Sequence, residues 1–170
     1  MKEQDISSLT FLKENIDVIV EPLDAAQIEY FGEGSERIQN SLNLIMEELS
    51  MVVLLLMGVD EGITNEELDL LNDMRHIVLG YDIPELNSDN YMELLGKYHA
   101  AYPERIFTVD HMPITVRILL AYDEKHGSNY AAKARELFAK FADAIIVTDK
   151  VKGFIEWALV ENFKEFMRNG

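Results

Sequence analysis

Apolar residues recur at intervals of three or four positions along most of this chain, and this periodicity restricts it to helical folds. The first run consists of Ile6, Leu9, Leu12, Ile16 and Ile19. Such spacing places the apolar side chains on one face of an α-helix. Strand signals are scarce, because no Asn-Gly or Asp-Gly pair separates two apolar runs and apolar and polar residues show no sustained alternation. We therefore expect an all-α bundle of seven to eight helices.

Helix boundary signals divide the chain into these elements. The first helix is expected to end before Pro22, since the residue before a proline avoids the helical region. Asp24 and Gln27 then form a capping-box-like pattern for a short second helix, and Thr64 with Glu67 forms a full capping box for a later one. The further signals are helix stops at Gly32, Gly34, Gly80 and Gly127, caps at Ser88 and Ser128, and a first helical position at Pro113. With no linker or low-complexity tract, one compact domain over residues 1–170 is the simplest account.

Charge and composition exclude several classes of function. Acidic residues outnumber basic ones 31 to 15, giving a net charge of −16, which repels nucleic-acid phosphates and anionic lipid headgroups. The absence of cysteine rules out disulfides, zinc–thiolate centres and cysteine nucleophiles, and it favours a reducing compartment. The longest apolar run, Met51–Met57, is far shorter than the about 20 residues needed to cross a bilayer. We expect a cytoplasmic protein that does not insert into membranes and does not bind nucleic acid.

One helix–turn–helix pattern occurs twice. Asp60 follows a long apolar helix and Glu67 comes seven positions later, and Asp149 and Glu156 repeat this spacing. Each intervening turn contains a glycine and a β-branched residue. An aspartate in such a turn can accept backbone N–H groups, and a glutamate near a helix start is favoured by the helix dipole. The pattern predicts two pseudo-repeated corners in one bundle.

These corners resemble the TerB-like (tellurite resistance protein B-like) helical family, whose members show Asp-Gly-x-Ile/Val followed by Glu in the first turn of the next helix. Asp60, Ile63 and Glu67 match that pattern, although the glycine is displaced to Gly62 and Glu61 takes its place. In the second copy Asp149 and Glu156 match, whereas the β-branched residue comes early and the glycine late. The resemblance covers roughly residues 40–80 and 129–167.

The resemblance implies a non-catalytic module for protein–protein interaction in a bacterial stress or tellurite-resistance system. TerB-like domains also occur beside ATPases and J-domain chaperones, so an adjoining domain is an expected partner, and a chain ending directly after a helix fits a domain cut from a larger protein. An acidic surface in the family has prompted proposals of divalent-metal binding. Carried over, the ligands would be Asp60, Glu67, Asp149 and Glu156, with Ca²⁺, Mg²⁺ or Mn²⁺ as the cation. Helix capping is the alternative role for these carboxylates.

A second interpretation is a di-metal enzyme. Asp73 with His76 and Asp123 with His126 each place a carboxylate three residues before a histidine on one helical face. Di-iron carboxylate bundles use Glu-x-x-His in this way, so these four residues form an alternative metal site. His126 would equally suit the dipole at a helix C-terminus. No phosphate-binding loop, Gly-x-Ser-x-Gly elbow or His-Glu-x-x-His motif is present, and no catalytic residue is predicted.

Overall fold

The computed structural model describes residues 10–57, 65–80, 82, 84–93, 112–149 and 154–169. Every regular element in these ranges is an α-helix, and no strand occurs among them. The all-α class predicted from the periodicity is therefore confirmed. None of the helices described is both long and apolar enough to span a bilayer.

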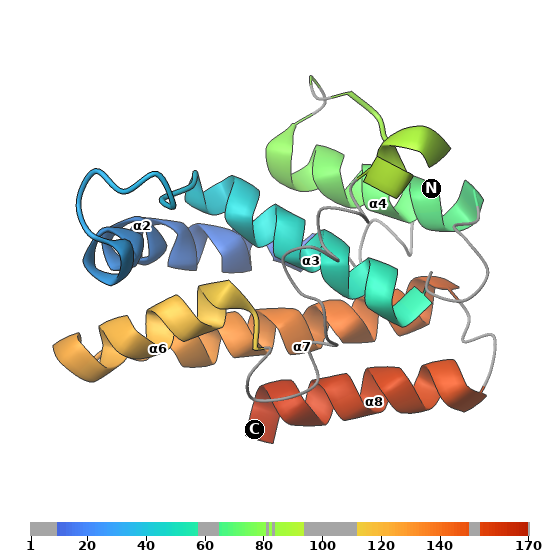
Figure 1. Cartoon of the computed structure of the whole chain (residues 1–170). Helices are drawn as coiled ribbons and strands as arrows, with labels where there is room; N and C mark the ends of the chain where they lie inside the picture. Colours follow the sequence, from blue (N-terminus) through green and yellow to red (C-terminus); the bar gives the residue numbers. More distant parts are fainter. Residues whose placement is uncertain are drawn as a thin grey trace.

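The helices surround one central helix, α7. Their bounds are α2 (Phe11–Phe31), α3 (Ser41–Met57), α4 (Asn65–Leu79), α6 (Ile114–His126), α7 (Tyr130–Asp149) and α8 (Phe154–Asn169), and residues 88–93 are helical as well. Helix α7 packs against α2, α3, α4, α6 and α8 (Figure 1). Its alanines at 131, 134, 139 and 142 are buried, and side chains this small allow neighbouring helices to approach closely. Aromatic rings at Phe138, Phe141 and Phe163 fill the core beside it.

Helix α2 runs through the proline that was expected to end it. Pro22 lies inside the helix, and no second helix begins at Asp24, so both boundary predictions are wrong here. A proline inside a helix removes one backbone hydrogen bond. Burial of Leu12, Ile16 and Leu23 on the inner face of α2 offsets that loss, because packing of an apolar face stabilises a helix more than local propensity does.

Asp24 and Gln27 instead link α2 to the start of α3 through hydrogen bonds. The Gln27 side-chain amide donates to the Gln39 carbonyl (3.0 Å) and accepts from the Gln39 N–H (2.9 Å). Gln27 also donates to the Ser41 hydroxyl (2.8 Å), which donates in turn to Asp24 (2.5 Å). Gln27 is fully buried, so this network satisfies polar groups that would otherwise be costly inside the protein.

A second amide clamp holds the segment after α4. Asn72 Nδ2 donates to the Leu86 carbonyl (3.1 Å), and the Leu86 N–H donates to Asn72 Oδ1 (2.7 Å). The same segment is held by Arg75, which donates to the Pro84 carbonyl (3.2 Å). The clamp sets the position from which the chain re-enters a helix at residue 88.

Several predicted boundaries agree with the structure. Helix α4 begins directly after Thr64, and α4 and α6 end at Gly80 and Gly127, whose φ angles of 97° and 67° suit glycine. Other boundaries are displaced. Asn87, not Ser88, accepts the free N–H groups at the start of the helix at 88–93, and Pro113 precedes α6 rather than beginning it.

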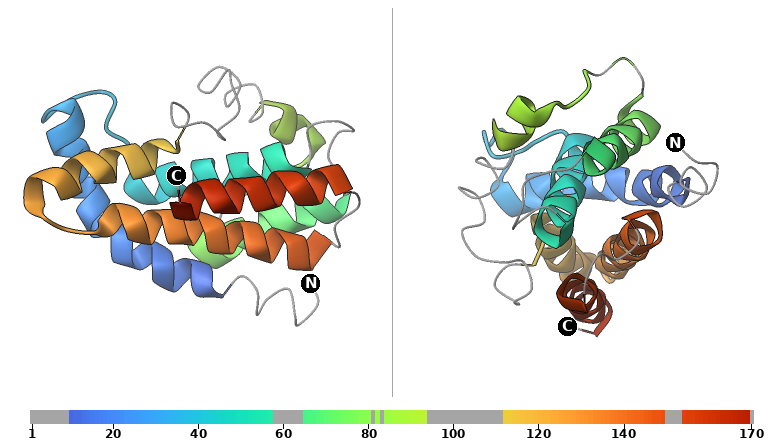
Figure 2. Two further views of the ribbon diagram at one scale, coloured as in Figure 1. Left: turned by 90° about the horizontal axis from the view of Figure 1, so that it is seen from below. Right: turned by 90° about the vertical axis from the view of Figure 1, so that its right-hand side faces the viewer.

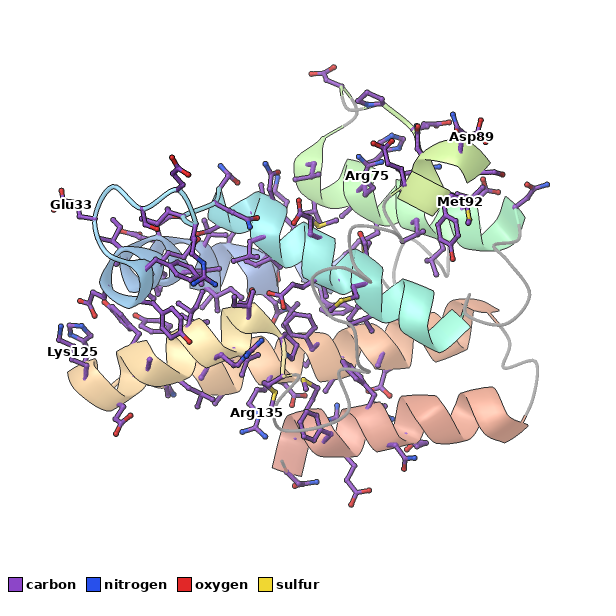
Figure 3. The ribbon with its side chains drawn as sticks, viewed as in Figure 1. Glu33, Arg75, Asp89, Met92, Lys125 and Arg135 are labelled. Carbon is purple, nitrogen blue, oxygen red and sulfur yellow. The ribbon has the colours of Figure 1, made fainter. Side chains whose placement is uncertain are left out.

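Charged side chains join α7 to α8. Arg168 pairs with Glu136 and Asp143 (both 3.3 Å), and Lys164 pairs with Asp143 and Glu161. Arg135, labelled in Figure 3, donates to the last carbonyl groups of α8 at Phe166 and Met167, which lack partners within the helix. These contacts fix the two helices side by side.

The ends of four helices gather at one end of the bundle. Figures 1 and 2 show that α3 and α7 finish, and α4 and α8 start, on the same side of the molecule. The connection from α3 to α4 and the connection from α7 to α8 are those that contain the two predicted corners.

Candidate functional site

The four carboxylates predicted as metal ligands belong to the connections at this end. Asp149 is the last residue of α7, while Glu67 and Glu156 each stand third in α4 and α8. Asp60 and the side chains of the other three lie outside what the structure describes. A helix ends before and a helix starts after each predicted corner, and both the repeat of the corners and the distances between the four carboxylates stay predictions.

The Asp123–His126 pair serves helix packing. Asp123 accepts hydrogen bonds from the Tyr130 N–H (3.0 Å), the Ala131 N–H (2.7 Å) and the Ser128 hydroxyl (2.5 Å). Its carboxylate therefore caps α7, the role that the sequence analysis gave to Ser128. His126 Nε2 lies 2.8 Å from Glu29 Oε1 on α2, which links the ends of α2 and α6.

The two Asp–His pairs do not share a site. Asp73 and His76 are half-buried on α4, whereas Asp123 and His126 belong to the last turn of α6. Figure 3 labels Arg75 on α4, in the upper part of the view, and Lys125 at the far left end of α6. Within the described ranges, no three His, Asp or Glu side chains are grouped in a way that would hold a metal ion.

A buried carboxylate that the sequence analysis missed lies at the start of α6. Glu48 on α3 is 2% exposed. It accepts hydrogen bonds from the Ile114 N–H (2.6 Å) and from both the N–H (2.8 Å) and the hydroxyl of Thr115. The first N–H groups of a helix have no partner within it, and Pro113 supplies no side-chain cap. Glu48 is therefore the cap of α6, provided from another helix.

Burial and hydrogen bonding act on Glu48 in opposite directions. Burial raises its pKa to about 7, and the hydrogen bonds from Thr115 and Ile114 together with the nearby Arg117 guanidinium counteract only part of that rise. The carboxyl group consequently changes protonation near neutral pH.

The helical register of α3 contains a signal that identifies Glu48. Positions 41, 45, 48 and 52 follow the spacing of one buried helix face. A glutamate on such a face must find hydrogen-bond donors, because an unpaired buried charge is strongly disfavoured. The sequence does not show which donors those are, since Ile114 and Thr115 lie far along the chain.

A shallow hollow opens between α2 and α6. It has a volume of about 270 Å³ and is lined by Ala26, Glu29, Tyr30, Ile118, Ala121, Tyr122 and Lys125. That volume lies below the range of about 300–1,000 Å³ that is typical of small-molecule sites. Glu29 is engaged at its rim by Lys125 (3.8 Å) and His126, and the His126 ring stacks on Tyr122 with 4.2 Å between centroids. The hollow suits one inserted side chain better than a substrate.

Large apolar side chains are exposed along α2. Five are prominent among the described residues, and three of these, Val18, Ile28 and Tyr30, belong to α2 at 46–49% exposure. Single exposed apolar residues are ordinary, whereas their concentration on one element marks a surface for interaction. The solvent-facing side of α2 is the strongest candidate for a binding surface in the described part of the chain.

Comparisons of this chain with protein-family models, with curated proteins and with solved structures found no match. The TerB-like resemblance rests on the corner residues alone.

Proposed function

We propose that this chain is a non-catalytic helical module that acts by binding another protein or an adjoining domain. The exposed apolar side chains of α2 carry the proposal, because the free energy falls when a partner covers water-exposed Val, Ile and Tyr side chains. The roles of Glu48 and Asp123 agree with it, since these carboxylates accept hydrogen bonds from helix starts and are not gathered in a cavity.

A photo-crosslinking amino acid placed on several faces tests this function in cells. Suitable exposed positions are Val18 on α2, Met92 (labelled in Figure 3), Leu120 on α6 and Lys140 on α7. A binding module gives one discrete adduct, identified by mass spectrometry, from one face and none from the other faces. If no face gives a discrete adduct, the chain is not such a module under the growth conditions tested.

We also propose that Asp60, Glu67, Asp149 and Glu156 bind a divalent cation. The observation that favours this is that the helix ends on either side of both predicted corners lie at one end of the bundle (Figure 2). Carboxylate oxygens are the preferred ligands of Ca²⁺, Mg²⁺ and Mn²⁺. The corners would then act together as one acidic site on the module.

Calorimetric titration with Ca²⁺ and Mn²⁺ tests the cation proposal. Binding should disappear in Asp60→Asn and in Asp149→Asn, and it should persist in Asp89→Asn, a matched change at an exposed aspartate elsewhere. Loss of binding in only one of the two corner variants contradicts a shared site. The alternative, an enzyme with metals bridged by Asp73, His76, Asp123 and His126, has no comparable support because the two pairs lie apart.

A further inference from the structure

We propose that the outer face of α2 binds a basic amphipathic helix of a partner protein; this inference rests on the module function proposed above. The face consists of Glu14, Val18, Glu21, Ala25 and Ile28, which we call the outer stripe. These residues are exposed, and their spacing of four, three, four and three places them along one side of the helix. Two of them are acidic and three are apolar.

The inner and outer faces of α2 have the same residue spacing but different surroundings. Leu12, Ile16, Ile19, Leu23 and Ala26 repeat the spacing of the outer stripe two positions earlier, and all five are buried. Helices α3, α6 and α7 pack against α2. The outer stripe is left to solvent, with Val18 and Ile28 nearly half exposed. A regular row of grooves between side chains is what a second helix needs for packing.

Charge selects the kind of helix that would fit. Helix α2 contains five acidic residues and one basic residue, Lys13. No ion pair within the described residues involves Glu14, Asp17 or Glu21. Lysine or arginine side chains on a partner could form ion pairs with these three acidic residues. The net charge of −16 on the whole chain would also attract a basic segment from a distance.

Charge also decides between two possible occupants of the outer stripe. A second copy of this acidic chain would bring like charges together, so the basic partner is the occupant that the charges favour.

A synthetic peptide serves as the probe. It has about 18 residues, or five helical turns, with leucine at the spacing of the outer stripe and lysine on both flanks. NMR chemical-shift mapping on the whole chain should place the perturbed amides on the outer stripe, and circular dichroism should report helix gained by the peptide. A peptide with the same composition in scrambled order should bind far more weakly.

Charge reversal with rescue makes the test specific. The double variant Glu14→Lys with Glu21→Lys should lower affinity for the lysine peptide about tenfold or more, and it should bind a peptide with glutamate in place of lysine. The matched control, Asp89→Lys with Glu93→Lys, reverses two exposed acids on the helix at 88–93 and should keep the affinity of the parent chain.

The possible outcomes separate this inference from the proposed function. Equal binding of the scrambled peptide, shifts that map to another face, or an equal loss in the control variant would each overturn the outer stripe as the binding surface. A discrete cellular adduct from Met92 or Lys140 instead of Val18 would likewise overturn the stripe while supporting the module. Absence of adducts from every face would contradict the module itself.

Discussion

Glu48 is an ionisable side chain in the core, and its carboxylate caps the start of α6. Both of its oxygens accept hydrogen bonds from the backbone N–H groups of Ile114 and Thr115 at the start of α6, and the helix dipole favours negative charge at that point. Burial acts against the charged form and raises the pKa of the group to about 7. The folded protein therefore holds a proton at Glu48 over a pH range in which the unfolded chain has released it.

The raised pKa predicts how stability depends on pH. Between an unfolded pKa of 4.5 and a folded pKa of about 7, the folded state binds more protons than the unfolded state. The free energy of unfolding should therefore fall as pH rises through this window, by up to about 3 kcal/mol from this group. Urea unfolding at pH 5, 6, 7 and 8 measures the fall.

Substitution of Glu48 isolates its contribution. Glu48→Gln should flatten the pH dependence while lowering stability at every pH, because an amide nitrogen then faces a backbone N–H. Glu47→Gln changes the adjacent exposed residue and should keep the slope of the parent chain. An unchanged slope in Glu48→Gln would show that another group causes it.

Asp123 connects two helices through one carboxylate. Removal of the side chain in Asp123→Ala should lower the free energy of unfolding by about 1–2 kcal/mol, the usual cost of losing a helix cap, because the Tyr130 and Ala131 N–H groups lose their acceptor. Thermal unfolding followed by circular dichroism measures this. Glu124→Ala removes the next, exposed carboxylate and should cost much less, and equal losses in the two variants would refute the cap.

At the scale of elements, amide side chains hold the segments between helices. Gln27 and Asn72 each pair with both backbone groups of a single residue, Gln39 and Leu86. A side-chain amide can do this because it has the same donor and acceptor as a peptide group. The clamps let irregular segments lie against helices without leaving polar groups unpaired.

Loss of the Gln27 clamp should detach the start of α3. Gln27→Ala removes the partners of the Gln39 backbone groups and one partner of Ser41, which predicts a loss of about 3 kcal/mol. Hydrogen exchange should rise first at residues 39–45. The exposed Asn43→Ala change serves as control, and unaltered exchange in Gln27→Ala would contradict the role of the clamp.

Local signals predicted the helices well wherever they act within one helix. Gly80 and Gly127 were recognised as stops because a residue with positive φ is a property of the local backbone. The errors at Pro22 and Ser128 have a tertiary origin: packing keeps α2 intact, and Asp123 supplies the cap of α7 from the preceding helix. The hollow and the exposure of the outer stripe depend on which helices pack against each other. The spacing of residues within one helix does not reveal this.

At the scale of the whole molecule, the net charge of −16 works against compactness. The ion pairs of Lys164 and Arg168 between α7 and α8 are partly exposed, and such pairs contribute little to stability. Screening of the repulsion between acidic side chains should therefore change the stability more than screening of these ion pairs does.

Added salt should stabilise the protein. Raising NaCl from roughly 20 mM to roughly 500 mM shortens the range of electrostatic forces to a few ångström, so the repulsion between acidic side chains is screened. The midpoint of urea unfolding should move to higher urea. A shift to lower urea would show that the ion pairs between α7 and α8 dominate instead.

The cap of α6 has a consequence for the order in which the chain folds. Glu48 and Ile114 are 66 positions apart, so a nascent α6 lacks its acceptor until α3 has formed and docked. Closing a loop of this length carries an entropic cost that a cap from a neighbouring residue does not. During synthesis α3 leaves the ribosome before α6 does. The capping of α6 by Glu48 therefore requires that the N-terminal half of the chain has folded first.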